Sequence, residues 1–254
     1  MSTGPVTRRV LDGRLAVVTG ASSGIGRAIA IELAAHGADV WLVARRADAL
    51  EAGAAEAGRH GTRVRTFPMD LTRDADLERL RDALKQDGDG VDILVHAAGA
   101  HFMGAVAEAP VAELDEQYRV NLRGPYVLTQ LLLPLLRARR GQIVFVNSSV
   151  GLEARAGVGA YAATKHGLRA LADALRQEVN VDGIRVVSVY AGRTATPLQR
   201  EIHAREGKPY DPERLLQAVD VASAVAHALG LPRTAEVTDV RVRPMQPPAA
   251  PRRA

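Results

Sequence analysis

Two residues that could exchange protons, Tyr161 and Lys165, stand four positions apart in a stretch whose apolar residues have helical spacing. Side chains four apart on a helix lie on one face and can interact. A phenol has a pKa of about 10 and exchanges protons poorly at neutral pH, but a neighbouring ammonium group favours the phenolate and lowers that pKa. The pair could therefore serve as a general acid and base, although the same spacing is common on helix surfaces without any such role.

A glycine-rich turn follows the first apolar run of the chain. Residues 19–26 read Thr-Gly-Ala-Ser-Ser-Gly-Ile-Gly and lead into a helical stretch. Glycines let a backbone turn tightly and approach a phosphate, and the N-terminus of the next helix offers free N–H groups. Ser22 and Ser23 add hydroxyl donors. The turn is predicted to bind a phosphate, the alternative being a tight strand-to-helix turn without a ligand.

Short β-branched runs alternate with stretches of helical spacing along the whole chain. The runs predict strands at residues 15–19, 40–43, 64–67, 93–95, 143–146, 184–189 and 237–242. The stretches between them predict helices at residues 26–36, 47–57, 74–86, 111–139, 161–179 and 219–229. This alternation predicts an α/β fold in which a doubly wound parallel sheet of about seven strands carries helices on both faces.

A single domain over residues 1–254 is expected, because α/β folds often exceed about 200 residues. Its ends, 1–9 and 244–254, are rich in Pro, Arg and small residues and are expected to be flexible. An irregular stretch is expected at residues 192–212. Ligands of an open α/β sheet bind beyond the carboxyl ends of its strands, so this stretch is placed to act as a lid.

The composition excludes several classes of protein. The chain has no cysteine, which rules out disulfides, thiolate metal sites and a cysteine nucleophile, and no metal site is predicted. The net charge of +4 comes from basic residues interleaved with acids, and aromatic residues make up only 4%, so nucleic-acid binding is not expected. No apolar window is long enough to span a membrane, and residues 1–14 lack the core of a signal peptide. A cytoplasmic protein without a membrane partner is expected.

The motifs, taken in order, resemble one enzyme family. TGxxxGxG after the first strand, followed much later by Tyr-Ala-Ala-Thr-Lys at residues 161–165, is similar to the classical short-chain dehydrogenase/reductase family. Further matches are Asp70-Leu71, Ala97-Ala98-Gly99, Asn121, Ser148 and Ala191-Gly192. The resemblance spans residues 11–244. It implies a Rossmann-type fold and hydride transfer between a nicotinamide cofactor and a small-molecule carbonyl or secondary alcohol.

The end of the second strand bears on the choice of cofactor. Members of this family that use NAD tend to have an acid there, whereas this chain has Ala44 followed by Arg45 and Arg46. A guanidinium group can grip the 2′-phosphate that a carboxylate would repel. NADP(H) is therefore predicted, with Arg45 as the main contact and Arg46 as a helper. The alternative is that both arginines are solvated residues at a helix start.

The resemblance also assigns further cofactor contacts. They are Gly20, Ser22, Ser23, Gly24, Ile25 and Gly26 in the turn, Asp70 and Leu71 on the adenine side, Ala97, Ala98 and Gly99 on the nicotinamide side, Tyr161 and Lys165, and Thr194 and Thr196 in the lid. For Asp70 the alternative is a helix cap formed together with Thr72. Substrate selectivity is expected from the rest of the lid, with Leu198, His203 and Tyr210.

The catalytic set implied by the resemblance is Asn121, Ser148, Tyr161 and Lys165. Tyr161 would be the general acid in carbonyl reduction and the base in alcohol oxidation. Ser148 would stabilise the substrate oxygen, Lys165 would also reach the ribose hydroxyls of the cofactor, and Asn121 would hold a water near the lysine. Ser149 is the alternative to Ser148, and the alternative for Asn121 is a mid-helix asparagine that faces solvent.

Two segments depart from the family pattern. The usual Asn-Asn-Ala-Gly is here His96-Ala97-Ala98-Gly99, and the usual Pro-Gly is Ala191-Gly192. For His96 a structural hydrogen bond is expected rather than a catalytic role. His101 could face the substrate, although a polar loop residue is the simpler interpretation. Gly124 and Pro125 predict an irregularity in the fourth long helix.

Two other functions are weighed against the leading one. A regulator that binds NADP(H) without turnover is disfavoured by the intact catalytic motifs. An epimerase or dehydratase is disfavoured by the glycine spacing and by the lack of an extra substrate domain. Family members usually pair through the two long helices, here residues 111–139 and 161–179, so a homo-oligomer, either a dimer or a tetramer, is expected.

Overall fold

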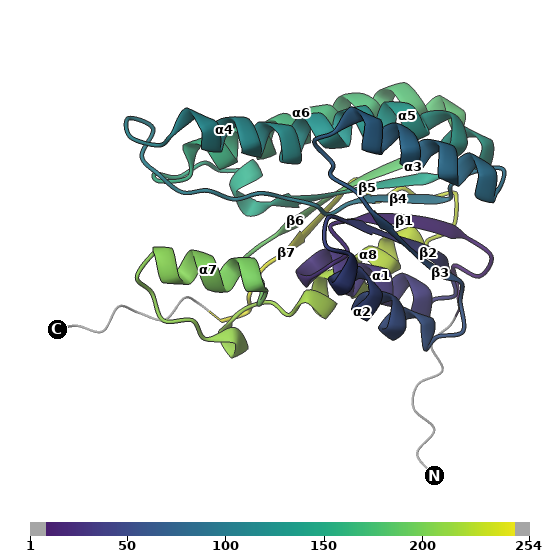
Figure 1. The fold of residues 1–254 in the computed structure, drawn as a ribbon, viewed down its shortest axis with the longest axis horizontal. Coiled ribbons are helices and arrows are strands. Elements are labelled where there is room, and N and C mark those ends of the chain that lie inside the picture. Colours follow the sequence, from purple (N-terminus) through teal and green to yellow (C-terminus); the bar gives the residue numbers. More distant parts are fainter. Residues whose placement is uncertain (1–8, 247–254) are drawn as a thin grey trace, which may run out of the picture.

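Seven parallel strands form one sheet across residues 9–246, which are the residues that this computed structural model describes (Figure 1). The strands are β1 (Leu15–Thr19), β2 (Asp39–Ala44), β3 (Val64–Pro68), β4 (Ile93–His96), β5 (Gln142–Ser148), β6 (Arg185–Ala191) and β7 (Asp239–Val242). Their order in the sheet is β3-β2-β1-β4-β5-β6-β7. All the predicted strands are confirmed, with ends shifted by one or two residues. The ends expected to be flexible lie mostly outside the described residues.

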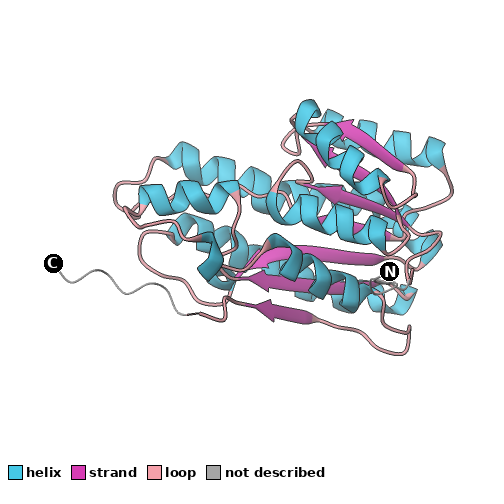
Figure 2. Cartoon of the chain, turned by 90° about the horizontal axis from the view of Figure 1, so that it is seen from below, coloured by secondary structure: helices cyan, strands magenta, loops and turns pink. Residues whose placement is uncertain are grey.

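Helices link the strands and cover the sheet. They are α1 (Gly24–Ala35), α2 (Ala47–Gly58), α3 (Asp74–Asp87), α4 (Val111–Tyr118), α5 (Gly124–Arg139), α6 (Gly159–Val179), α7 (Pro197–Arg205) and α8 (Ala218–Leu229). One face packs against α1, α2 and α8, and the other packs against α3, α5 and α6 (Figures 1 and 2). This is the predicted Rossmann-type single domain. Within residues 9–246, no helix combines the length and the apolar character needed to cross a membrane.

The central strand β1 contributes to both cores. Successive residues of a strand point to opposite faces of the sheet, so Ala16 and Val18 join the core under α1 and α8, whereas Leu15 and Val17 join the core under α3 and α5. All five residues of β1 are buried. This explains why the strand is a continuous apolar run instead of an alternating one.

The chain reverses its direction of winding between β1 and β4, which are neighbours in the sheet. A crevice at the carboxyl ends of the strands is the usual ligand site of such folds. Thr19, the last residue of β1, closes the base of this crevice. Its hydroxyl donates to the Val95 carbonyl at 3.2 Å and accepts the Ala97 N–H at 3.1 Å. The end of β1 and the segment after β4 are therefore held together below the site.

One prediction from the sequence is confirmed and another needs correction. The irregularity predicted in the helix over residues 111–139 is a turn of π-helix, Arg119–Arg123, which separates α4 from α5 and directly precedes Gly124. The stretch at residues 192–212 is not irregular throughout, because it contains α7. Thr196 caps α7 by accepting the Gln199 N–H at 3.1 Å, and Pro197 follows in the first turn. A capping Thr followed by Pro is a helix-start signal that was present in the sequence.

Candidate active site

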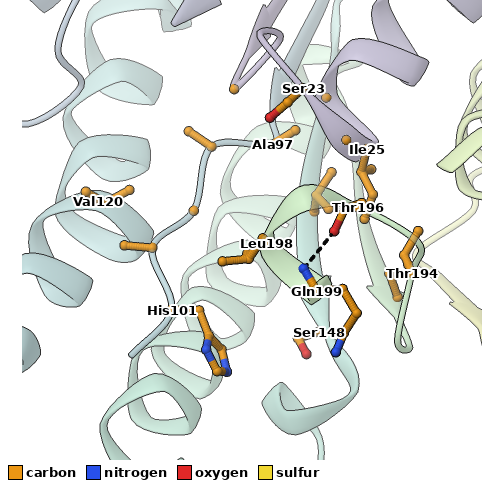
Figure 3. A pocket seen from close by; sticks show the side chains of 18 of the residues that line it. Ser23, Ile25, Ala97, His101, Val120, Ser148, Thr194, Thr196, Leu198 and Gln199 are labelled. Atoms are coloured by element: carbon orange, nitrogen blue, oxygen red, sulfur yellow. Dashed lines mark hydrogen bonds between the residues drawn. The ribbon is translucent and has the colours of Figure 1, made fainter. Parts of the chain in front are cut away.

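A cavity of about 640 Å³ opens beyond the carboxyl ends of β1, β2, β4, β5 and β6. The predicted site residues that line it are Gly20, Ser22, Ser23, Gly24, Ile25, Gly26, Arg45, Arg46, Asp70, Leu71, Ala97, Ala98, Gly99, Ser148, Tyr161, Lys165, Thr194 and Thr196. Figure 3 shows Ser23 and Ala97 toward one end of it and His101 and Ser148 toward the other. Of the predicted set, Asn121 alone is not on its wall.

The glycine-rich turn is shaped by close backbone contacts. Gly20 has a φ of +69°, in the left-handed region that favours glycine, and a Cβ atom there would lie 2.6 Å from the Ala98 nitrogen. A Cβ atom at Gly26 would collide with the carbonyl oxygen of Gly20. A side chain at Gly20 would therefore push the turn away from the segment after β4, and a side chain at Gly26 would force the turn itself open. The glycines keep the floor of the cavity open to a ligand.

The N-terminus of α1 is free to receive an anion. Ser23 is its N-cap residue but makes no capping hydrogen bond with its side chain, and the first turn holds no acidic residue. The free N–H groups and the positive end of the helix dipole therefore face the cavity uncompensated. Ser22 and Ser23 both line the cavity there. This donor set fits the diphosphate of a dinucleotide.

Arg45 and Arg46 are exposed side chains that follow β2 on the wall of the cavity. Asp70 lies nearby. Burial alone would raise the pKa of Asp70, but hydrogen bonds from Thr72 and the charges of Arg45 and Arg73 lower it overall. Asp70 Oδ1 accepts the Thr72 N–H at 2.9 Å and its hydroxyl at 2.8 Å, which closes a local turn before α3 begins. Asp70 therefore does not cap α3, whose N-cap residue is Arg73.

Ser148, Tyr161 and Lys165 meet at the opposite end of the cavity. Ser148 ends β5 and hydrogen-bonds the Tyr161 side chain, whereas its neighbour Ser149 is exposed. Lys165 is buried one helical turn after Tyr161, with Nζ 5.8 Å from the centre of the phenol ring. Nζ also donates to the Val146 carbonyl at 3.0 Å. The geometry favours Ser148 over Ser149 as the partner of Tyr161.

Burial governs the protonation of this pair. It raises the pKa of Tyr161 to about 12, and the hydrogen bond with Ser148 lowers that pKa only in part. It also lowers the pKa of Lys165 to about 8. The expectation that Lys165 lowers the pKa of Tyr161 is therefore wrong for this structure, because loss of solvation raises that pKa and outweighs the hydrogen bond with Ser148. Tyr161 is a neutral phenol at pH 7.

A sequence model of the short chain dehydrogenases matches residues 14–207, which include the glycine-rich turn and the Ser148, Tyr161 and Lys165 cluster. The chain belongs to the short-chain dehydrogenase family. The match covers most of the chain and leaves out only its ends and the last helix and strand.

Related proteins align with nearly the whole of this chain. Glycine betaine reductase ATRR of Emericella nidulans is 35% identical over 96% of this chain, which spans only 20% of that protein. An uncharacterized oxidoreductase of Staphylococcus aureus is 31% identical over 93% of this chain and 99% of its own. Among solved structures, the alcohol dehydrogenase of the archaeon Thermococcus sibiricus, complexed with 5-hydroxy-NADP, has a TM-score of 0.83 and 29% identity over 93% of this chain and 99% of that one.

Asn121 of this dehydrogenase lies behind the cavity wall, inside the π-helical turn. It is buried, so the alternative of a solvent-facing asparagine is wrong. Its side chain accepts the Ala100 N–H at 2.8 Å, donates to the Ala100 carbonyl at 2.8 Å and donates to the Thr164 hydroxyl at 3.1 Å. Asn121 therefore joins the segment after β4 to the turn of α6 that carries Lys165.

The histidines of this dehydrogenase have different surroundings. His96 is buried, lies 2.9 Å from the Thr129 hydroxyl through Nε2 and stacks on Phe145, in agreement with a structural role. His101 lies on the cavity wall and packs against Tyr161. His203 does not line the cavity.

Of the three lid residues expected to set substrate selectivity, only one lines the cavity. Leu198 lines the cavity, whereas His203 and Tyr210 pack edge-on against each other with ring centres 5.4 Å apart. Sequence motifs did not single out Arg155 or Gln199, which also line the cavity. Arg155 lies in a loop between β5 and α6 and has no motif of its own, so only the fold places it at the site. Gln199 was detectable as the third residue after the capping Thr196.

Proposed function

We propose that this protein is an NADP(H)-dependent oxidoreductase that interconverts a carbonyl group and a secondary alcohol. The observation that carries the proposal is that one cavity joins Arg45, the free N-terminus of α1 and the pair of Ser148 and Tyr161. A dinucleotide held at its adenosine end by Arg45 would extend along this cavity toward Tyr161. When bound, the cofactor supplies the hydride.

The preference for NADP(H) rests on the residues that follow β2. Ala44 offers no carboxylate to the ribose hydroxyls, and the exposed guanidinium groups of Arg45 and Arg46 stand next to it on the cavity wall. A planar guanidinium binds a phosphate through two parallel hydrogen bonds. The similar alcohol dehydrogenase of Thermococcus sibiricus, complexed with 5-hydroxy-NADP, agrees with this choice.

The chain's own residues supply orientation and a proton. Ser148 orients the substrate oxygen and stabilises the negative charge that develops on it. Tyr161 donates a proton to that oxygen during reduction, for which the neutral phenol is the required form, and its pKa of about 12 keeps it neutral. Lys165 Nζ donates to Val146 and retains two further N–H groups for the ribose hydroxyls and the phenol.

The experiment is NADPH oxidation by the full chain with a panel of ketones, aldehydes and quinones, repeated with NADH. At least one carbonyl should be reduced, and NADPH should be the better cofactor. The Tyr161→Phe variant should lose turnover by roughly a thousandfold or more while it still binds NADPH, as followed by NADPH fluorescence. Full activity of that variant, or no turnover with any carbonyl, would exclude the proposal.

A homo-oligomer, a dimer or a tetramer, is also proposed, on the basis of apolar side chains on α4 and α5. Val111, Leu114, Tyr118 and Tyr126 are exposed there although they are large and apolar. Val111, Leu114 and Tyr118 are spaced three and four apart on α4 and so lie on one of its faces. Exposed apolar patches of this kind mark interaction surfaces. Light scattering should show an oligomer, and Leu114→Glu should weaken it, whereas a monomeric wild-type protein would refute the proposal. The cytoplasmic location expected from the sequence stays a prediction.

A further inference from the structure

Charged side chains gather on the cavity wall beside Tyr161. The ring of His101 packs edge-on against Tyr161, with ring centres 4.4 Å apart. His101 in turn lies within the electrostatic reach of Arg155, Arg205 and Glu206. Neither the cofactor contacts nor the proposed proton transfer uses these three charges. Of the three, only Arg155 lines the cavity, at the end that the cofactor leaves to the substrate.

The single carboxylate of this group is already neutralised. Both oxygens of Glu206 accept hydrogen bonds from Arg193 Nη2, at 2.6 and 2.7 Å, and Lys208 Nζ lies 3.1 Å from Oε2. The Glu206 side chain is only 8% exposed, so both contacts are partly screened from water. A carboxylate paired with two close cations attracts a third cation only weakly. The surroundings of His101 are therefore positive overall.

Of Arg155 and Arg205, Arg155 is the one that lines the cavity, and its ion pair with Glu206 is a long one. Its Nη2 atom comes no closer than 3.9 Å to Glu206, and within residues 9–246 it makes no hydrogen bond. Its side chain is 51% exposed and lines the cavity. A guanidinium group has five donors in a planar fork that matches a carboxylate. The guanidinium of Arg155 therefore offers N–H donors, in the geometry that binds a carboxylate, at the substrate end of the cavity.

Other groups at this end do not cancel the charge of Arg155. Burial and the Arg155 charge lower the pKa of His101 to about 4, so its imidazole is neutral at pH 7. Glu116 and Glu201 also line the cavity, but within residues 9–246 neither forms an ion pair with Arg155. Of the cations on this part of the wall, Lys165 is assigned to the cofactor ribose and Arg193 is paired with Glu206, so Arg155 is the one left for the substrate.

We propose that the carbonyl substrate of this enzyme carries a carboxylate group, which Arg155 binds. The inference rests on the proposed carbonyl reduction and names its substrate class. Arg155 and Tyr161 line the same cavity, and His101, which packs against Tyr161, lies within the electrostatic reach of Arg155, so one small molecule can place a carboxylate at Arg155 and a carbonyl at Tyr161. An oxo acid with a short spacer between its carboxylate and its carbonyl meets this requirement.

The kinetic test compares acetoacetate and levulinate with their methyl esters, which keep the carbonyl and lose the charge. For the wild-type enzyme, kcat/KM with NADPH should be at least tenfold higher for one of the acids than for its ester. Arg155→Met should reduce this ratio by roughly tenfold to a hundredfold, because a charge-assisted bidentate contact is lost. The control Arg59→Met removes an exposed positive charge outside the cavity and should leave the ratio unchanged.

The outcomes separate the inference from the proposed function. Reduction of neutral ketones without any preference for the acids, or an unchanged ratio in Arg155→Met, would overturn the inference while the reductase function stands. If no carbonyl is reduced at all, the proposed function fails. The assignment of a carboxylate to Arg155 is then tested by ligand binding alone.

That binding test is calorimetric titration of pentanoate, and of its uncharged amide, into the enzyme saturated with NADP⁺. Pentanoate should bind at least tenfold more weakly to Arg155→Met than to the wild type, and the amide should bind weakly to both. Absent or unchanged pentanoate binding would contradict the inference. Tighter binding of methyl phosphate than of any carboxylate would contradict the assignment to a carboxylate.

Discussion

The side-chain amide of Asn121 makes two hydrogen bonds with the backbone of Ala100. It accepts the Ala100 N–H and donates to the Ala100 carbonyl, both at 2.8 Å. The pair fixes the backbone directly before His101 and directly after Gly99. It is possible because Asn121 lies in a π-helical turn, where the wider backbone turns its side chain toward the segment after β4. A residue outside the cavity therefore holds part of the cavity wall.

Asn121→Ala should destabilise the protein and reduce its activity together. The substitution removes one buried and two partly buried hydrogen bonds and leaves both polar groups of Ala100 without their protein partner. We expect the free energy of unfolding in urea to fall by roughly 3 kcal/mol, and kcat/KM to fall more than tenfold. Asn180→Ala, which removes one exposed bond to Glu236, should cost less than about 1 kcal/mol. Equal effects of the two variants would contradict the positioning role of Asn121.

Arg45→Asp should reverse the preference between the two cofactors. The carboxylate repels the 2′-phosphate and can accept hydrogen bonds from ribose hydroxyls. We expect kcat/KM for NADPH to fall by roughly a hundredfold and that for NADH to stay the same or rise. Arg46→Asp should show a weaker form of the same change, and Arg59→Asp, outside the cavity, should show none. An unchanged preference in Arg45→Asp would exclude the assigned contact.

The buried ammonium of Lys165 should make stability rise with pH in the alkaline range. Its pKa is about 8 in the folded chain against 10.5 when it is exposed, so the unfolded state binds more protons between these values. Lys165→Met should lack this rise. Between about pH 7.5 and about pH 9.5, the wild type should gain about 2 kcal/mol in unfolding free energy relative to the variant.

The control for this measurement is Lys85→Met, which removes an exposed lysine on α3 and should follow the wild type. Tyr161 contributes with the opposite sign at higher pH. Its folded pKa of about 12 exceeds the ordinary 10.0, so its contribution is lost only as the pH rises above 10.0. A difference between wild type and Lys165→Met that does not grow with pH would show that Lys165 is not buried as a weak base.

The ion pair of Arg193 and Glu206 should hold α7 in place over the cavity. Burial alone would raise the pKa of Glu206, but hydrogen bonds from Arg193 and Lys208 lower it to about 2. Its stabilisation is therefore present above about 4.5 and is lost as the pH falls toward 2. In Glu206→Gln, hydrogen exchange of α7 at neutral pH should speed up by roughly tenfold or more.

Glu201→Gln is the matched control for that exchange measurement, because Glu201 lies on the same helix, is exposed and forms no ion pair within residues 9–246. The rest of the chain should keep its exchange rates in both variants. If exchange in Glu206→Gln rises throughout the protein, the ion pair supports the whole fold instead of the lid.

The local parts of this protein could be read from its sequence. The strands and most helices follow from residue periodicity, and the turn at residues 19–26 follows from glycines that a short segment needs wherever it folds. The four-residue spacing of Tyr161 and Lys165 depends on one helix only. Even α7 was present as a local signal, because Thr196 and Pro197 mark its start. Such features depend only on residues that are close in the chain, so they can be predicted without knowledge of the fold.

Only the tertiary structure decided the environment of those side chains. The pKa of Tyr161 rises because elements distant in the chain bury its side chain, which outweighs the hydrogen bond with Ser148. Arg155 and His101 come to line one cavity because β4 and β5 are adjacent in the sheet and both end there. Solvation and long-range charge depend on what packs around a residue in space, and the order of residues along the chain does not specify that by itself.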